Sequence, residues 1–343
     1  MNPNRRNFLS KAVAYSGFAA GVPLNSAMIR KASDPVNHAP NSSPVCTEQD
    51  DETKEHDAQP TPTDRKYVDV HVHITQTWNE RGELTARNLL RWMDVHDIGQ
   101  AWVLPLISPE AWYYPITTEF VLEETRPFRD RLIPFCVVDP RTDVFGGFKH
   151  FVDLLGRYKN AGARGFGEHK WGGAIDDPRN IELLKACGET GLPVLFHLDN
   201  DRNKDVPGLP GLERLLKAAP ETTLIGHGPG WWASICGAAT QRDLGGYPRG
   251  QVAKNGALDR LLGDYPNLYA DLSAGSGHNA IRRDLDFGRE FMIRNADKIM
   301  FGTDYLADKQ AVNQFELFDE LKLPVDVQQK IFRDNAHAII DDE

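Results

Sequence analysis

From Lys66 to the C-terminal end, short apolar runs alternate with segments whose apolar residues recur at helical spacing. The apolar runs are short, rich in β-branched and aromatic residues, and bounded by polar or turn-forming residues, as buried strands are. They predict strands over Tyr67–His71, Gln100–Leu106, Leu132–Val138, Ala163–Glu168, Pro193–His197, Thr222–His227, Leu268–Leu272 and Lys298–Phe301.

The segments between these strands have the spacing of amphipathic helices. They predict helices over Glu83–Asp97, Thr117–Arg129, Phe148–Asn160, Pro178–Thr190, Leu209–Ala219, Leu258–Leu262, Arg283–Asn295 and Val312–Leu321. Eight strand–helix units in about 270 residues have the size and rhythm of an α/β fold of the TIM type, the (β/α)8 barrel. A doubly wound sheet is the alternative, but no G-x-G-x-x-G motif follows the first strand.

The N-terminal residues 1–27 have the layout of an export signal. The pair Arg5-Arg6 precedes Phe8, and a mildly apolar run extends from Ala12 to about Ala27. A charged start followed by a short apolar stretch is typical of export signals, and the paired arginines resemble a twin-arginine (Tat) signal. We therefore expect the Tat translocase as a partner during export, and a periplasmic or otherwise extracytoplasmic location.

Residues 28–65 contain almost no large apolar side chains and are rich in Pro, Ser, Thr, Asn, Asp and Glu. Such a composition cannot bury a core, so we predict a disordered polar linker there and a barrel domain over residues 66–343. The formal net charge is −10, which disfavours binding to phosphate backbones, so we expect a small-molecule substrate and no nucleic acid. The four cysteines lie far apart, which argues against a zinc–cysteine site or a disulfide framework. A homo-oligomer is left open.

Polar residues interrupt the apolar runs at the carboxyl ends of several predicted strands. His71 and His73 end the first strand, His197 the fifth and His227 the sixth, and Asp304 follows the eighth. Barrel enzymes build their active sites at this end from several strands, and residues two apart on a strand share a face. Imidazole and carboxylate groups gathered in this way are typical ligands of a divalent metal ion.

The same residues carry a resemblance to a known family. The H-x-H motif on the first strand, histidines on strands five and six and an aspartate on strand eight resemble the amidohydrolase superfamily. The chain is similar to the amidohydrolase-related (amidohydrolase-2) branch in three further segments: Leu268-Tyr269-Ala270-Asp271-Leu272-Ser273, Phe301-Gly302-Thr303-Asp304-Tyr305 and Asn335-Ala336. That branch includes metal-dependent hydrolases, lactonases, nonoxidative decarboxylases and some members without metal.

The resemblance implies a role for each of these residues. His71, His73, His197 and Asp304 would hold one divalent ion, with Zn²⁺ the best match to these ligands. His227 would act as a general acid or base, because a neutral imidazole is available near pH 7. Asp304 would serve both as a ligand and as a proton acceptor.

The fourth predicted strand departs from this one-metal pattern. Glu168 and Lys170 share a face by the period of two, and TatD-type hydrolases look similar here. If this similarity extends to the metal site, Glu168 and His227 would hold a second ion. We expect one ion and leave a site with two ions open. Alternatively, Glu168 or Lys170 binds the substrate, or the two form a buried ion pair.

Three further residues are candidates for substrate binding beside Lys170. Arg202, in the loop after the fifth strand, has the fork geometry that suits a carboxylate, and Trp231 and Trp232 follow His227 and could floor a pocket. The alternative for Arg202 is that it lies in a solvated charged loop. The alternative for the two tryptophans is that they only pack the loop.

These features favour a metal-dependent hydrolase that attacks an ester, lactone or amide carbonyl of a small polar substrate through metal-activated water. The first alternative is a nonoxidative decarboxylase (a carboxy-lyase) of an aromatic or unsaturated acid on the same site. A TatD-type binuclear hydrolase and an exported binding protein without chemistry are the others.

Overall fold

The computed structural model describes residues 61–76, 81–142 and 146–340. The predicted export signal and nearly all of the predicted linker lie outside these residues. Among the described residues, none of the helices combines the length and apolar character needed to cross a membrane.

Within the described residues, eight parallel strands form one sheet whose spatial order follows the chain, from β1 to β8. The strands span Tyr67–Val72 (β1), Ile98–Val103 (β2), Leu132–Cys136 (β3), Gly165–His169 (β4), Val194–His197 (β5), Leu224–His227 (β6), Leu268–Asp271 (β7) and Ile299–Met300 (β8). A strictly sequential order of parallel strands is that of a (β/α)8 barrel, and the predicted fold is therefore confirmed. A doubly wound sheet would reverse its strand order at a switch point, which this sheet does not do.

The barrel closes where the last strand meets the first. The amide of Val70 donates to the carbonyl of Phe301 at 3.0 Å, and the amide of Asp304 donates to the carbonyl of His71 at 2.8 Å. A third bond runs from the amide of His73 to the carbonyl of Tyr305 at 2.9 Å. This seam brings the carboxyl ends of β1 and β8 together.

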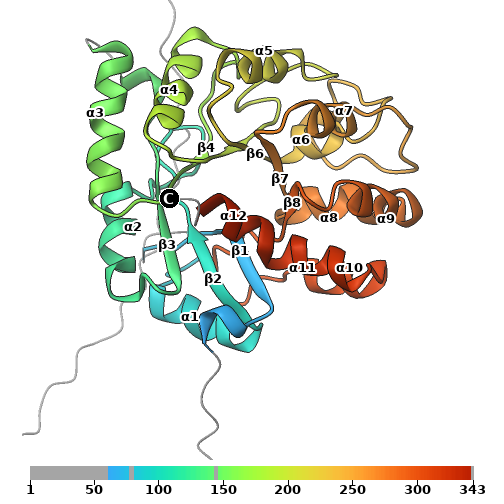
Figure 1. Ribbon diagram of the computed structural model, residues 1–343, viewed down its shortest axis with the longest axis horizontal. Coiled ribbons are helices and arrows are strands. Elements are labelled where there is room, and N and C mark those ends of the chain that lie inside the picture. Colours follow the sequence, from blue (N-terminus) through green and yellow to red (C-terminus); the bar gives the residue numbers. More distant parts are fainter. Residues whose placement is uncertain (1–60, 77–80, 143–145, 341–343) are drawn as a thin grey trace, which may run out of the picture. The chain divides into compact units, whose positions relative to one another are not determined.

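The helices surround the strands (Figure 1). They span Ala86–Val95 (α1), Thr118–Thr125 (α2), Gly147–Asn160 (α3), Pro178–Glu189 (α4), Pro210–Ala218 (α5), Pro229–Ala233 (α6), Ala257–Asp264 (α7), Ala274–Arg282 (α8), Leu285–Arg294 (α9), Gln314–Leu321 (α10), Val325–Gln329 (α11) and Asn335–Ile340 (α12). Short 3₁₀ segments occur at Pro62–Asp64, Arg126–Phe128, Pro140–Thr142 and Asp243–Gly245, and a π-helical turn occurs at Lys330–Asp334.

Local sequence explains where several helices begin. The side chains of Thr85 and Thr117 accept the amides of Asn88 and Phe120, which caps α1 and α2. Helices α6 and α8 were not among the predicted helices. They follow strands β6 and β7, α6 is only five residues long, and α8 contains two glycines, which lower helix propensity; neither therefore showed a clear helical periodicity.

An apolar plug fills the barrel interior. Its members are contributed by six strands and by the last helix: Val68, Val70, Trp102, Leu104, Ile133, Phe135, Leu195, Ile225, Met300, Ala336 and Ile340. A second and larger cluster fills the layer between the strands and the helices. Polar side chains that follow the plug along the strands therefore gather at the carboxyl end, with an apolar floor beneath them.

Candidate metal centre

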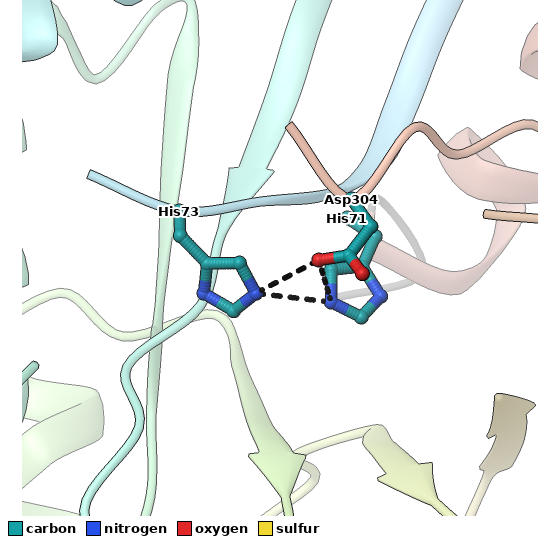
Figure 2. A group of neighbouring side chains, drawn as sticks. All are labelled: His71, His73 and Asp304. Carbon is teal, nitrogen blue, oxygen red and sulfur yellow. Dashed lines mark hydrogen bonds and ion pairs between the residues drawn. The ribbon is translucent and has the colours of Figure 1, made fainter. Parts of the chain in front are cut away.

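His71 and His73 present their Nε2 atoms to each other across 3.2 Å, and both side chains are buried (Figure 2). The Nδ1–H of His73 donates to the carbonyl of Leu104 at 2.8 Å, and that of His71 donates to Oδ2 of Asp271 at 2.7 Å. Because both Nδ1 atoms are engaged, the neutral form of each imidazole has its lone pair on Nε2, and the two Nε2 atoms face the same point.

Two carboxylates complete this group. Oδ1 of Asp304 lies 3.6 Å from Nε2 of His71 and 3.4 Å from Nε2 of His73. Dashed lines in Figure 2 join this oxygen to both nitrogens. Oε2 of Glu168 lies 3.5 Å from each of the same two nitrogens. The structure thus brings two imidazoles and two carboxylates from β1, β4 and the end of β8 to one point.

These spacings match those of a tetrahedral metal site. With metal–ligand bonds of 2.0–2.2 Å, the ligand atoms of a tetrahedral zinc site are separated by about 3.3–3.6 Å. Oδ1 of Asp304 is buried and accepts no hydrogen bond from the described residues, which is costly unless a cation faces it. The four side chains therefore fit a divalent ion in both geometry and donor chemistry.

Glycine at position 167 allows Glu168 to reach this point. Gly167 has φ of +137°, and a Cβ there would lie 2.3 Å from the carbonyl oxygen of Leu195. A side chain at this position would push β4 away from β5 and displace the carboxylate that follows.

A second group lies on the other side of Glu168. Oε1 of Glu168 is 3.0 Å from Nδ1 of His197 and 3.6 Å from Nε2 of His227, and these three side chains form a separate candidate metal group. Since Oε2 belongs to the first group and Oε1 to the second, Glu168 has the geometry of a carboxylate that bridges two metal positions.

His197 differs from the sequence prediction in its neighbours. It was predicted to ligate one ion with His71, His73 and Asp304, but its Nδ1 faces Glu168 and its Nε2 donates to Asp199 at 2.8 Å. Oε2 of Glu168 is the further ligand atom beside His71 and His73, whereas Nδ1 of His197 contacts Oε1 of the same carboxylate.

Two residues to which the sequence reasoning assigned no role contact Nδ1 of His227. Its Nδ1 lies 3.0 Å from Oδ2 of Asp271 and 2.9 Å from Oγ of Ser273. Both residues are buried at the end of β7. The signal that could have found Asp271 is an acidic residue that ends an apolar strand, at the same level as the predicted histidines.

The charges of the cluster influence one another strongly. Burial opposes ionisation of Glu168, but Lys170 and His71 together hold its pKa well below the usual range. Burial also opposes protonation of His71, yet the surrounding carboxylates, Glu168 first among them, raise its pKa well above the usual value. Burial and the charge of His71 lower the pKa of His227, which favours its neutral form.

A cavity of about 820 Å³ opens beside the second group. Lys170, His197 and Arg202 line it, together with Pro109, Glu110, Ala111, Trp112, Tyr113, Asp199, Asp201, Pro229, Gly245, Gly246 and Tyr247. Lys170 also lies 3.0 Å from Oε2 of Glu168, so one side chain joins the cavity to the first group. A cavity of this size accommodates a small organic substrate.

Trp231 and Trp232 lie elsewhere than predicted. Both are almost completely buried in α6, and neither is among the described residues that line the cavity. Nε1 of Trp232 donates to the carbonyl of Asp271 at 2.9 Å, and the ring of Trp231 packs against Gly226 and edge-on to Phe196. The structure therefore gives them packing contacts behind the site instead of a surface that a substrate could touch.

Arg202 lies at the cavity with two of its five guanidinium N–H donors already engaged. Its Nε donates to the carbonyl of Glu110 at 2.7 Å, and one terminal nitrogen donates to Asp199 at 2.8 Å. Neither edge of the guanidinium fork is therefore entirely free to grip a carboxylate in two places.

Comparisons with known proteins agree with this architecture. A probable 2-pyrone-4,6-dicarboxylic acid hydrolase from Acinetobacter baumannii matches 80% of this chain and 99% of its own, with 14% identity and a TM-score of 0.54. A 2,6-dihydroxybenzoate decarboxylase from Rhizobium matches 81% of this chain and 99% of its own, with 18% identity and a TM-score of 0.52. A 5-carboxyvanillate decarboxylase from Sphingomonas paucimobilis matches 80% and 99%, with 13% identity and a TM-score of 0.51.

No curated protein matches the chain significantly in sequence. At these identities the solved structures establish the barrel fold and nothing finer. The amidohydrolase family model, however, matches residues 68–341, which is most of the 343-residue chain. With the H-x-H pair, the inward carboxylates and the sequential barrel already described, this match shows that the chain is an enzyme of the amidohydrolase family.

Proposed function

We propose that the chain is a metal-dependent hydrolase of an ester, lactone or amide. The proposal rests on the near-tetrahedral spacing of four side chains: His71, His73, Glu168 and Asp304. No other contact among the described residues accounts for all four side chains lying together. When bound there, a divalent ion such as Zn²⁺ would polarise a carbonyl and make water a better nucleophile.

His227 is the proposed general base. Its Nδ1 is occupied by Asp271 and Ser273, so the lone pair of Nε2 faces the space beside Glu168. From this position a neutral imidazole accepts the proton of the attacking water and returns it to the leaving group. Lys170, which lines the cavity, donates from its ammonium group to the carbonyl oxygen of the substrate.

The choice of reaction rests on Arg202. A carboxylate clamp would favour a decarboxylase, and two donors of Arg202 are already engaged by Glu110 and Asp199. This favours hydrolysis. Decarboxylation of an aromatic or unsaturated acid is the second candidate, because Trp112, Tyr113 and Tyr247 give the cavity an aromatic wall and the similar proteins include decarboxylases.

One ion in the first group is the proposed resting composition. A second ion held by Glu168, His197 and His227 would make the enzyme a TatD-type binuclear hydrolase. The proposal of zinc rests on the two imidazoles. One similar protein, a dihydroxybenzoic acid decarboxylase from Polaromonas, has manganese bound instead.

Metal analysis and a substrate panel test this proposal together. Purified protein should contain about one equivalent of Zn²⁺, a chelator should abolish activity, and Zn²⁺ should restore it. A panel of lactones, esters, amides and aromatic carboxylic acids, with released CO₂ recorded for each, distinguishes the two reactions. Release of CO₂ without hydrolysis would assign the decarboxylase, and activity that survives complete removal of metal would refute both.

Export by the Tat route to a periplasmic or other extracytoplasmic location is also proposed, because Arg5-Arg6 precede Phe8 and a mildly apolar run from Ala12 to about Ala27. The double change of these two residues to lysine should retain the full-length protein in the cytoplasm, as measured by fractionation. Export that continues at the normal level would refute the Tat signal.

A further inference from the structure

Asp271 occupies a position from which it controls two histidines of the candidate centre at once. Its Oδ2 lies 2.7 Å from Nδ1 of His71, which belongs to the first metal group, and 3.0 Å from Nδ1 of His227, which belongs to the second. Asp271 is fully buried, its Oδ2 contacts the Nδ1 atoms and not the Nε2 atoms that face Glu168, and its other oxygen accepts from the amide of Ser273 at 2.8 Å.

The hydrogen atoms around this carboxylate can be assigned by counting donors. The hydroxyl of Ser273 has one proton, and its Oγ lies 2.7 Å from Oδ2 of Asp271, which as a carboxylate can only accept. Oγ can therefore only accept from Nδ1 of His227, 2.9 Å away. Every neighbour of this Nδ1 is an acceptor, so the proton of His227 must reside there.

The same count of hydrogen-bond donors and acceptors applies to Nδ1 of His71. Its Nδ1 faces Oδ2 of Asp271 at 2.7 Å and Oγ of Ser273 at 3.2 Å, and both atoms accept. A neutral imidazole that is protonated on Nδ1 has its lone pair on Nε2. The Nε2 atoms of His71 and His227 are the ones that face Glu168.

We propose that Asp271 is a positioning residue that fixes the Nδ1–H tautomer of both His71 and His227, so that both Nε2 lone pairs point into the metal centre. A carboxylate hydrogen-bonded to a ligating histidine is worth ten- to a hundred-fold in metal affinity in other metal sites. Here Asp271 accepts from His71 of the first group and from His227 of the second. It therefore couples the two metal positions without being a ligand at either.

The Asp271→Asn variant tests this directly. Asparagine keeps the shape but places an NH₂ donor against both Nδ1 atoms, and rotating the amide would instead set that donor against the amide of Ser273. In their neutral forms, His71 and His227 should therefore carry the proton on Nε2. The readout is a two-bond ¹H–¹⁵N spectrum of full-length, metal-free protein labelled on histidine, recorded at pH 8, with the His227 signals assigned by their loss in His227→Gln.

The expected result is an Nδ1–H signal for His227 in the unsubstituted protein and an Nε2–H signal in Asp271→Asn. The affinity for Co²⁺ alone, followed by its visible absorption, should fall ten- to a hundred-fold. An unchanged His227 tautomer in Asp271→Asn would overturn the proposal.

Two controls separate positioning from general loss of packing. Asp69 is equally buried and accepts from the amide and hydroxyl of Thr303, at 3.0 and 2.6 Å, and from the backbone amide of His71. Asp69→Asn should lower the melting temperature and leave the His227 tautomer unchanged, and Ser273→Ala should also leave it unchanged. A tautomer that moves in either control would assign the effect to packing or to the serine, and so refute the role of Asp271.

The cobalt readout rests on the proposed metal centre, whereas the tautomer readout does not. If the unsubstituted protein binds no Co²⁺, the proposed function fails while the spectrum still decides the role of Asp271.

Discussion

The ammonium group of Lys170 lies 3.0 Å from Oε2 of Glu168, the same carboxylate oxygen that faces the imidazoles of His71 and His73. Lys170 also lines the cavity. One cation thus stabilises the charge of a candidate metal ligand and reaches the space that a substrate would enter.

This relationship predicts the behaviour of Lys170→Met. Loss of the ammonium should lower kcat about 10²- to 10³-fold, as removal of a donor to a developing oxyanion does in other enzymes. The measurement is steady-state kinetics on the best substrate from the panel. Lys204→Met, at an exposed lysine in the next loop, is the control and should leave kcat within two-fold. Equal losses in both variants would mean that Lys170 has no special role.

His227→Gln is predicted to separate catalysis from metal binding. A general base typically contributes 10²- to 10⁴-fold to the rate, so kcat should fall by that order. The ion of the first group should be retained, because His227 is not a member of that group. Metal content and kcat are measured on the same preparation. Loss of one equivalent from a protein that holds two would instead indicate a binuclear centre.

Trp232→Phe is predicted to affect stability and not substrate binding. The change removes the hydrogen bond from Nε1 to the carbonyl of Asp271, and a buried acceptor left unpaired costs about 1–3 kcal/mol. The free energy of unfolding should fall by that amount, measured by urea denaturation, with KM unchanged within two-fold. A ten-fold rise in KM at unchanged stability would show that the indole contacts the substrate, which is one of the two roles that the sequence left open.

Asp139 is predicted to make stability depend on acid pH. Burial opposes its ionisation, but hydrogen bonds from Arg141 and Ser108 outweigh that cost and lower its pKa to about 2. Because the folded-state pKa lies below the unfolded value of about 3.9, this stabilisation is complete above pH 4 and is lost as pH falls toward 2.

Asp139→Asn should therefore lower the free energy of unfolding by about 1–2 kcal/mol at pH 7, with the difference narrowing below pH 4. Urea denaturation of both proteins between pH 3 and pH 7 measures this. Asp264→Asn, at an exposed carboxylate 3.9 Å from Arg260, should show almost no difference at any pH. A constant deficit for Asp139→Asn across the whole range would argue against the pKa shift.

The sequence was informative about the fold because periodicity is a local property. Apolar runs and helical spacing located all eight strands, although β2 begins two residues earlier than predicted and β8 is only two residues long. Helix α6, over Pro229–Ala233, was missed because it is one turn of helix with two glycine or proline residues at its start.

The site was only partly predictable, because its details depend on distances between strands. The residues that the sequence selected do gather at one end of the barrel, but periodicity cannot say that one carboxylate, Glu168, contacts both His71 and His197. It also could not find Asp271, whose importance comes from a contact with His71 across 200 positions of sequence. Trp231 and Trp232 illustrate the opposite error, since aromatic residues beside a catalytic histidine look the same in sequence whether they face the cavity or the core.

The seam between β8 and β1 has a consequence for how the protein is made. The candidate ligands His71 and His73 stand on the first strand, and Asp304 follows the last, where its amide bonds to the carbonyl of His71. A nascent chain that has not yet emerged past position 304 therefore lacks a complete set of ligands, however well its earlier strands have formed. Capture of an ion by this set of residues would therefore come late in synthesis, and the ion would link the first strand of the barrel to the last.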